Sequence, residues 1–269
     1  MGTRPTTGIV TNTQVTLVQI DNYGPWTVTP SPRREADLQT LQSRLYADFA
    51  QLFGNRGGYT FFARFDNMIA VTNGIGVEEH ALIQESVGNR YPVTVSFSIG
   101  TGSTPADALE LATRQLQDAG SAQDAERQEI LRGEPIPEAE RTDEDVEIAH
   151  FDVNDATGRY TDELHAFDSF VHIEGGYHAL MRHLHEEYGS LAFFVGGDNV
   201  IAVGAGLSAP EYEGAIDHVE QEAGVDLKVG VGRGPDPREA GMAAKHALER
   251  CREEGTRVEG APVAASGAD

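Results

Sequence analysis

The chain repeats itself across its two halves. The run Tyr59–Val71 recurs at an offset of 132 as Leu191–Val203, with seven of thirteen positions identical. The same offset relates Gly100–Pro105 to Gly232–Pro237. Short apolar runs match by chance, but a fixed offset kept across separate segments indicates an internal duplication. A length of 269 residues also suits two domains of ordinary size.

Each half has the pattern of one α+β unit. A β-rich run is followed by a helix with apolar residues at three- and four-residue spacing, and then by two apolar runs that flank Asp-Asn, which is typical of a hairpin. A second helix, an alternating strand and a third helix with proline in its first turn complete the half. This order predicts two duplicated ferredoxin-like βαββαβ domains. The second helices are expected at 77–88 and 209–223.

The remaining segments set the expected domain limits. The stretch 121–145 is acidic and contains prolines, which favours a linker with a short helix around 124–132. Both ends are of low complexity, so we expect disorder there. The predicted organisation is an extension at 1–14, a domain at 15–120, a linker at 121–145, a domain at 146–258 and a tail at 259–269.

Composition excludes several classes of protein. The net charge is −23 and only two cationic residues are Lys, so binding to nucleic-acid phosphates is disfavoured. This balance favours a protein adapted to high salt over an acidic mesophilic enzyme. The longest apolar runs are far too short to cross a bilayer, and no basic and apolar leader is visible near the start, so we expect a cytoplasmic protein. A single cysteine, Cys251, excludes a disulfide framework and a cysteine-type zinc site.

Four aspartates are the candidate catalytic residues. Asp21 and Asp152 each end a first strand, at an offset of 131, and Asp66 and Asp198 each lie in a hairpin. In this topology we expect Asp21 to face Asp66 and Asp152 to face Asp198. Close carboxylates repel unless a cation lies between them, and Mg²⁺ suits such oxygen ligands and substrate phosphates. Two such ions are expected. The alternative is that Asp-Asn is ordinary turn chemistry.

Glycines favour the second half as the metal site. Gly196 and Gly197 precede Asp198 and let a phosphate approach the backbone, so Asp152 and Asp198 are the preferred metal ligands, with Asp21 and Asp66 as the alternative. The first-half loop contains the only Trp, Trp26, which either stacks a base or fills a domain interface. The candidate substrate-binding residues are Asn22, Tyr23, Trp26, Arg64, Asn67, Asn154, Thr157, Gly196, Gly197 and Asn199.

The Gly-Gly-Asp-Asn hairpin resembles those of palm-type nucleotidyl cyclases, and longer runs give a closer resemblance. Those runs are Gln19–Thr27, Pro32–Glu35, Leu41–Tyr46, Arg64–Asn67, Asn89–Pro92, Gly120–Asp124 and Phe193–Asn199. Together they resemble archaeal GTP cyclohydrolase III, and the similarity runs from about residue 15 to 258. The departures are the segment 1–14, the acidic surface and the tail.

The resemblance implies a reaction that the residues alone do not reach. It implies Mg²⁺-dependent hydrolysis of GTP, in which the guanine imidazole ring opens and the triphosphate is cut to a monophosphate. The product would be 2-amino-5-formylamino-6-(5-phosphoribosylamino)pyrimidin-4(3H)-one, a precursor of flavins and deazaflavins. The resemblance also implies activation by K⁺, a homotetramer and no zinc. A nucleotide or diguanylate cyclase and an inactive nucleotide-binding module are the alternatives, although Asn199 replaces the Glu of the diguanylate cyclase motif.

Overall fold

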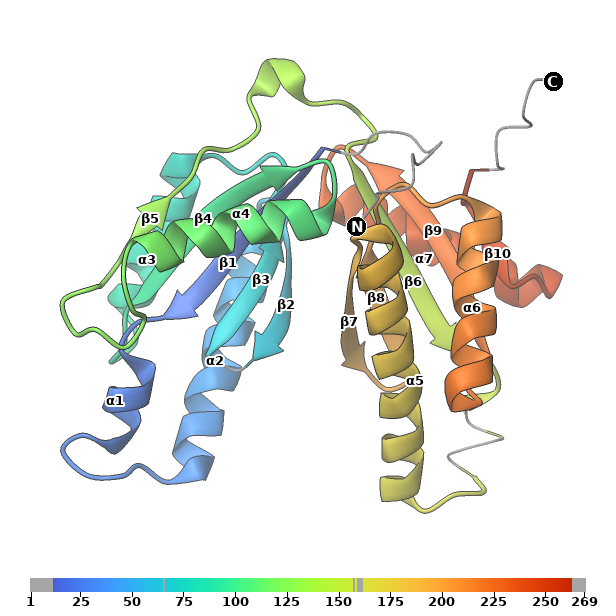
Figure 1. The fold of residues 1–269 in the computed structure, drawn as a ribbon, viewed down its shortest axis with the longest axis horizontal. Helices are drawn as coiled ribbons and strands as arrows, with labels where there is room; N and C mark the ends of the chain where they lie inside the picture. The colour runs from blue at the N-terminus through green and yellow to red at the C-terminus, as the bar shows by residue number, and fades with distance from the viewer. Residues whose placement is uncertain (1–11, 65, 157, 159–161, 263–269) are drawn as a thin grey trace. The chain divides into compact units, whose positions relative to one another are not determined.

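The computed structural model describes residues 12–64, 66–156, 158 and 162–262 of the chain. They form two compact units (Figure 1). The first unit comprises Asn12–Asp145 with Pro235–Arg238, and the second comprises Val146–Gly234 and the chain from Glu239 onward. The described helices include none that is both long and apolar enough to cross a bilayer.

The first unit is a five-stranded sheet with helices on both faces. Its strand order is β2-β3-β1-β4-β5, with β5 parallel to β4 and the other neighbours antiparallel. The elements are β1 (Thr13–Ile20), α1 (Tyr23–Val28), α2 (Glu35–Gly54), β2 (Tyr59–Arg64), β3 (Asn67–Val71), α3 (Val77–Gly88), β4 (Val95–Gly102), α4 (Pro105–Asp118), β5 (Leu131–Arg132) and the 3₁₀ helix η1 (Glu138–Glu140).

The second unit repeats this arrangement. Its strand order is β10-β9-β6-β8-β7, with β10 parallel to β9. The elements are β6 (Val146–Val153), α5 (Ala166–Tyr188), β7 (Leu191–Gly196), β8 (Asn199–Val203), α6 (Ala209–Ala223), β9 (Leu227–Gly234), α7 (Pro237–Glu254) and β10 (Val258–Glu259). The prediction of a duplicated α+β fold is confirmed, and α3 and α6 have the predicted limits.

Apolar periodicity places the helices on the sheets. In α2, Leu41, Leu45 and Phe49 are buried on one helical face and pack with Val18 of β1 in the core of the first unit. The opposite face of that sheet carries α4, which approaches β4 so closely that a Cβ on Gly100 would collide with the backbone of α4. Both units are therefore three layers thick, with the central strand buried on both sides.

The strand registers show which residues of the two halves are equivalent. On β1, Gln19 occupies the position that Asp152 occupies on β6, because both lie opposite the first residue of the hairpin's second strand. The register partners are Asn67 and Ser96 for Gln19, and Asn199 and Lys228 for Asp152. The hairpin and β4/β9 partners are related by an offset of 132, whereas the first-strand residues are related by an offset of 133.

Asp21 is consequently equivalent to Asn154. The backbone N–H of Asp21 donates to Thr94 O, and that of Asn154 donates to Asp226 O, so the acceptors are again related by an offset of 132. The residues that follow, at positions 22 and 155, both adopt φ of 51°. Our expectation that Asp21 matches Asp152 was wrong by two residues. A two-residue shift keeps the same side chains on the same face of a strand, so the apolar pattern does not reveal it.

The acidic segment 121–145 belongs to the first unit. It contributes β5, and it places Arg127 and Ile136 among the buried residues. The N–H of Ile136 donates to Oε1 of Gln14 in β1 at 2.9 Å. Instead of the expected linker with a helix at 124–132, the structure has turns and a short strand there.

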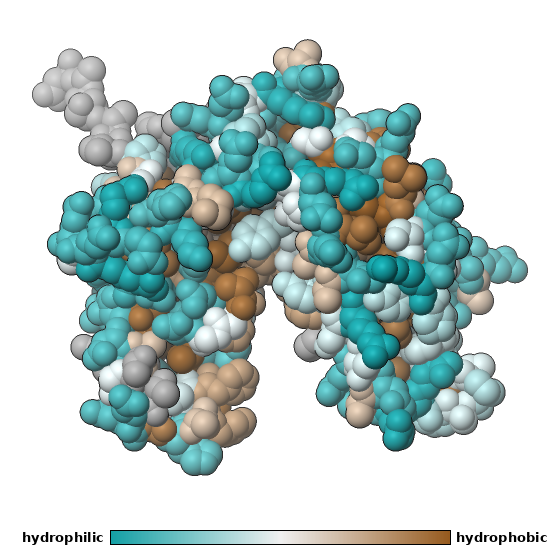
Figure 2. Space-filling view, turned by 180° about the vertical axis from the view of Figure 1, so that it is seen from behind, coloured by the Kyte–Doolittle hydropathy of each residue, from teal (hydrophilic) through white to brown (hydrophobic). Residues whose placement is uncertain are grey.

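The predicted ends fall partly outside the described residues. Residues 1–11 and 263–269 are not described, but β1 already begins at Thr13 and β10 occupies the start of the expected tail. The visible face in Figure 2 is mostly hydrophilic, in agreement with the acidic composition.

Candidate functional site

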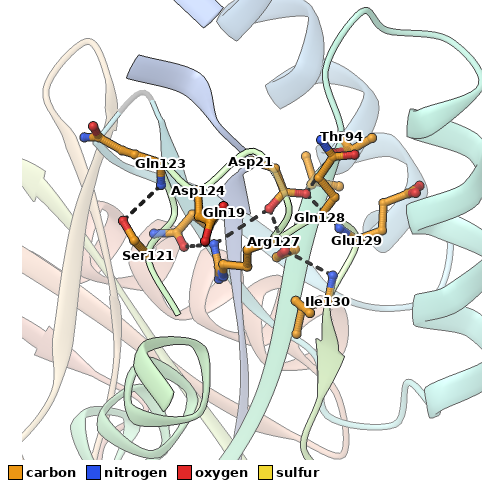
Figure 3. Close-up of polar contacts among 12 residues, drawn as sticks. Gln19, Asp21, Thr94, Ser121, Gln123, Asp124, Arg127, Gln128, Glu129 and Ile130 are labelled. Atoms are coloured by element: carbon orange, nitrogen blue, oxygen red, sulfur yellow. Dashed lines mark hydrogen bonds and ion pairs between the residues drawn. The ribbon is translucent and has the colours of Figure 1, made fainter. Parts of the chain in front are cut away.

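Asp21, just after β1, is the centre of a buried polar network in the first unit (Figure 3). Its Oδ2 accepts from Thr94 Oγ1 at 2.8 Å and from the backbone N–H of Glu129 at 2.9 Å, and its Oδ1 accepts from Ser96 Oγ at 2.6 Å. An ion pair at 3.8 Å joins Oδ1 to Nη1 of Arg127. The carboxylate is therefore saturated by the protein.

Arg127 supplies the charge that balances Asp21. Its side chain is 3% exposed and that of Asp21 is 1% exposed. Nη1 of Arg127 also donates to Oε1 of Gln19 at 2.9 Å, while Nε and Nη2 have no hydrogen-bond partner among the described residues. Gln19 Nε2 in turn donates to Asn67 Oδ1 at 3.0 Å. This chain of contacts connects the segment after α4 to the hairpin β2–β3.

A pocket of about 330 Å³ lies beside Asp21. Asn22 and Gln128 supply polar groups to it, and Trp26 and Tyr91 supply aromatic surface. The Tyr91 hydroxyl donates to Asp48 Oδ2 at 2.8 Å. Burial, together with that hydrogen bond, raises the pKa of Tyr91 to about 12, so the phenol stays neutral at ordinary pH.

A larger pocket of about 700 Å³ adjoins the first and shares Trp26 and Tyr91 with it. Four arginines line this second pocket: Arg33, Arg34, Arg44 and Arg90. The Arg33 guanidinium lies 3.9 Å from the centre of the Trp26 ring, as in a cation–π contact. Two of the other guanidiniums are already paired, Arg34 with Asp37 and Arg90 with Asp48, both at 2.8 Å. The pockets join an aromatic wall to a cationic wall, which suits a nucleotide.

The second unit neutralises its aspartate differently. Oδ2 of Asp152 lies 2.9 Å from Lys228 Nζ and 3.1 Å from Arg252 Nη2. Burial is the largest single influence on the pKa of Arg252 and lowers it, but the hydrogen bond to Asp152 and the charges of Asp152, Glu249 and Asp198 together raise the pKa above its usual value. Asp152 and Asp198 are thus both within electrostatic range of one guanidinium. We expected a metal ion at this place, and the structure has protein cations there.

The hairpins also differ between the units. Asp66 pairs with Arg64 at 3.1 Å, whereas Asp198 Oδ1 accepts from its neighbour Asn199 at 3.0 Å. Gly196 and Gly197 have φ of 112° and 64°, which other residues adopt rarely, so both glycines are required by the turn. Oδ1 of Asn199 accepts a hydrogen bond from Nε2 of His150 at 2.8 Å.

The remaining predicted residues have structural contacts. Tyr23 accepts a hydrogen bond from Gln42 at 2.7 Å, and burial raises its pKa. Asn154 bonds Asp226 and Lys228 at 3.0 and 2.9 Å. Thr157 lies outside the described residues. Of the predicted set, the structure brings Asp21, Asn22 and Trp26 together around one pocket.

Sequence reasoning missed Arg127, Gln128 and Tyr91 in the first unit and Lys228 and Arg252 in the second. Two of them carried a usable signal. Lys228 is one of only two lysines in the chain. Arg127 is a rare cation in an acidic segment, and its burial shows that the segment was not a solvated linker.

A metal held by the protein alone does not fit the described residues. Among them, no three His, Cys, Asp or Glu side chains are grouped so that they could hold an ion. Both oxygens of Asp21 and Oδ2 of Asp152 are already engaged by donors and cations. Mg²⁺ in nucleotide sites commonly uses one or two carboxylates plus substrate phosphates, so the metal expectation concerns the nucleotide-bound protein.

A further pocket, of about 600 Å³, lies on α5 and α6 of the second unit. It is lined by histidines, including His183 and His218, whose rings stack at 4.4 Å. This pocket contains none of the predicted site residues. The two pockets that share Trp26, called the Trp26 pockets below, are therefore the better candidate.

Comparison with known proteins identifies the family. The family model described as GTP cyclohydrolase III matches residues 15–266. GTP cyclohydrolase III 1 of Halobacterium salinarum and GTP cyclohydrolase III of Natronomonas pharaonis are each 70% identical over 93% of this chain, covering 98% and 99% of those proteins. The Methanocaldococcus jannaschii GTP cyclohydrolase III is 46% identical over 89% of this chain and 88% of its own length.

Among solved structures, the FimX GGDEF domain of Pseudomonas aeruginosa is similar over 46% of this chain and 82% of that chain, at 12% identity and a TM-score of 0.39. The sequence matches cover both units, including the segments that form the Trp26 pockets and the Gly-Gly-Asp-Asn hairpin. The chain belongs to the GTP cyclohydrolase III family.

Proposed function

We propose that this chain hydrolyses GTP by opening the imidazole ring of guanine and cutting the triphosphate to a monophosphate. The carrying observation is the family match over residues 15–266. One water opens the ring and leaves the carbon as a formyl group on nitrogen, and each of the two phosphoanhydride bonds takes one more water. The products are 2-amino-5-formylamino-6-(5-phosphoribosylamino)pyrimidin-4(3H)-one and two phosphates.

The first unit is the proposed place of nucleotide binding. Trp26 and Tyr91 offer flat apolar surface for a purine in the smaller pocket, and Arg33 and Arg44 offer cationic groups for phosphates in the larger one. Guanidinium groups bind phosphate oxygens in a bidentate manner. The Asp21 carboxylate accepts hydrogen bonds that join the end of β1 to β4 and to the segment 127–130, so it is not a free carboxylate.

Metal ions enter this proposal with the substrate. We retain Mg²⁺, two ions per site, and substrate phosphates would supply part of its ligands. The preferred carboxylate ligands, Asp152 and Asp198, would place the metal in the second unit, and the alternative ligands, Asp21 and Asp66, would place it in the first unit. Bound Mg²⁺ would offset phosphate charge and polarise the bonds that break. Activation by K⁺, the absence of zinc, a homotetramer and a cytoplasmic location are also parts of the proposal, carried over from the family resemblance and the composition.

One assay separates the proposed reaction from its alternatives. The protein is incubated with GTP and MgCl₂ in molar KCl while purine absorbance and phosphate are followed. In the proposed reaction, ring opening removes the purine spectrum, and hydrolysis of the two phosphoanhydride bonds yields two phosphates per GTP. A cyclase would release pyrophosphate and preserve the purine, and a binding module would change neither, so an unaltered purine spectrum refutes the proposal.

A further inference from the structure

The side-chain oxygen of Asn22 is a buried hydrogen-bond acceptor that has no donor among the described residues. This atom, Oδ1, is shielded from solvent. The residue lines the smaller pocket. Leaving a buried polar atom unpaired costs stability, so such an atom in a pocket indicates a donor that arrives with a ligand.

The backbone holds this acceptor in place. Asn22 adopts φ of 51°, a left-handed conformation that Asn tolerates better than most residues. Its N–H donates to Ala122 O at 2.7 Å, which ties it to the segment 121–130. The equivalent residue of the second unit, Asp155, has the same φ.

Gln128 presents a second acceptor to the same pocket. Its Nε2 donates to Ala125 O at 2.8 Å, which orients the amide, and because the residue is exposed Oε1 is open to water and to a ligand. Its neighbours are both fixed, because Arg127 is buried beside Asp21 and the N–H of Glu129 donates to Asp21 (Figure 3). The Thr94 hydroxyl of this pocket donates to Asp21 and is not directed to a ligand.

We propose that Asn22 Oδ1 and Gln128 Oε1 select guanine by accepting from its N1–H and 2-amino groups while the base lies against Trp26 and Tyr91. The inference rests on the proposed function and names the residues that give it base specificity. Adenine carries an acceptor at N1 and no 2-amino group, so it offers neither oxygen a donor and leaves the buried Asn22 Oδ1 unpaired. Hypoxanthine keeps N1–H but lacks the 2-amino group, so it satisfies one of them.

Binding of diphosphates tests this inference without turnover. Trp26 is the only Trp and lines the pocket, so its fluorescence reports occupancy by GDP, IDP and ADP in MgCl₂ and molar KCl. We compare Asn22→Gly, which suits the left-handed backbone, with Gln128→Met, which preserves side-chain length. Gln117→Met, on the exposed side of α4, is the matched control. Asn22→Asp introduces the residue type that Asp155 has at the equivalent position, so it retains an acceptor and checks that position 22 tolerates substitution.

The expected result is a loss of selectivity rather than a general loss of binding. The natural protein should bind GDP at least about tenfold more tightly than IDP, and each of the first two variants should lower GDP affinity about tenfold while leaving ADP unchanged. Gln117→Met should retain the natural ratios. The inference is overturned if either variant keeps the natural GDP-to-ADP ratio, or if the natural protein binds GDP and ADP equally. A protein that selects GDP but leaves the purine of GTP intact would refute the proposed reaction and preserve this inference.

Discussion

Replacing Arg127 by Met tests whether the segment 121–145 is anchored by a buried charge pair. The substitution removes the guanidinium and leaves the Asp21 carboxylate, 1% exposed, with only neutral donors. At 3.8 Å and an effective dielectric constant of about 20, the attraction between the charges is about 4 kcal/mol. Removing one partner of a buried pair typically destabilises by about 3–5 kcal/mol, because the other charge stays buried. We expect a loss of about 3 kcal/mol, at the low end of that range, since three hydrogen bonds still hold the carboxylate.

The single Trp makes the assay specific to the first unit. Thermal unfolding is followed by fluorescence of Trp26 in 3 M KCl, where surface charges are screened and a buried pair is not. About 3 kcal/mol in a unit of this size corresponds to a fall in Tm of roughly 10 °C. The double variant Asp21→Asn/Arg127→Met should regain part of that loss, since no buried charge is left alone.

Arg252→Met is the matched control in the second unit. Arg252 is 42% exposed and shares Asp152 with Lys228, so its loss should cost less than about 1 kcal/mol. It should also leave the Trp26 transition unmoved, because Trp26 lies in the other unit. If Arg127→Met shifts Tm by no more than this control, the charge pair does not anchor the segment.

Three further outcomes follow from the composition, from a buried imidazole and from the candidate ligands. At −23 net charge, Tm should rise steeply between 0.05 and 3 M KCl, and a flat profile would contradict salt adaptation. His80 is unexposed and hydrogen-bonded to Thr16 at 2.8 Å, and burial lowers its pKa. The unfolded chain therefore binds more protons, so the stability of the first unit should fall as pH drops below about 6.5. His80→Gln should flatten this pH dependence when unfolding is followed by Trp26 fluorescence. If Asp152 and Asp198 hold the metal, Asp152→Asn/Asp198→Asn should abolish GTP turnover even well below its Tm, which should itself fall because Lys228 loses its charge partner, whereas full activity would transfer that role to Asp21 and Asp66.

Local patterns were sufficient to predict the main helices and strands of each half, but not α1, β5 or β10. The limits of α3 and α6 follow from acidic first turns and apolar spacing within each helix, which depend on neighbouring residues. The ferredoxin-like order of elements predicted the sheet order, because such a unit places the first strand beside the hairpin. The apolar pattern could not predict which residues pair across neighbouring strands. An offset of 131 and one of 133 bury the same face of β1, and only the ladder distinguishes them.

The site was harder to predict because its charges come from distant segments. Arg127 reaches Gln19 across 108 positions, and Lys228 reaches Asp152 through strand pairing. Close carboxylates in a sequence pattern indicate that a cation is needed, but not whether that cation is a metal or a side chain. In both units the structure places a cationic side chain beside the aspartate, Arg127 in the first and Lys228 in the second.

Salt adaptation bears on how such a site recognises phosphate. At molar salt the Debye length is about 3 Å, so neither the net charge of −23 repels a nucleotide nor a distant positive field attracts it. Recognition then depends on groups in contact with the phosphates. Arginine suits that task because its planar guanidinium binds oxygens in pairs and is less strongly hydrated than the Lys ammonium. Four of the chain's arginines line one pocket, beside its only Trp, and Lys228 lies instead on Asp152. Both units thus use a cation to neutralise a buried aspartate of their own, and the first unit in addition lines a pocket with guanidinium groups.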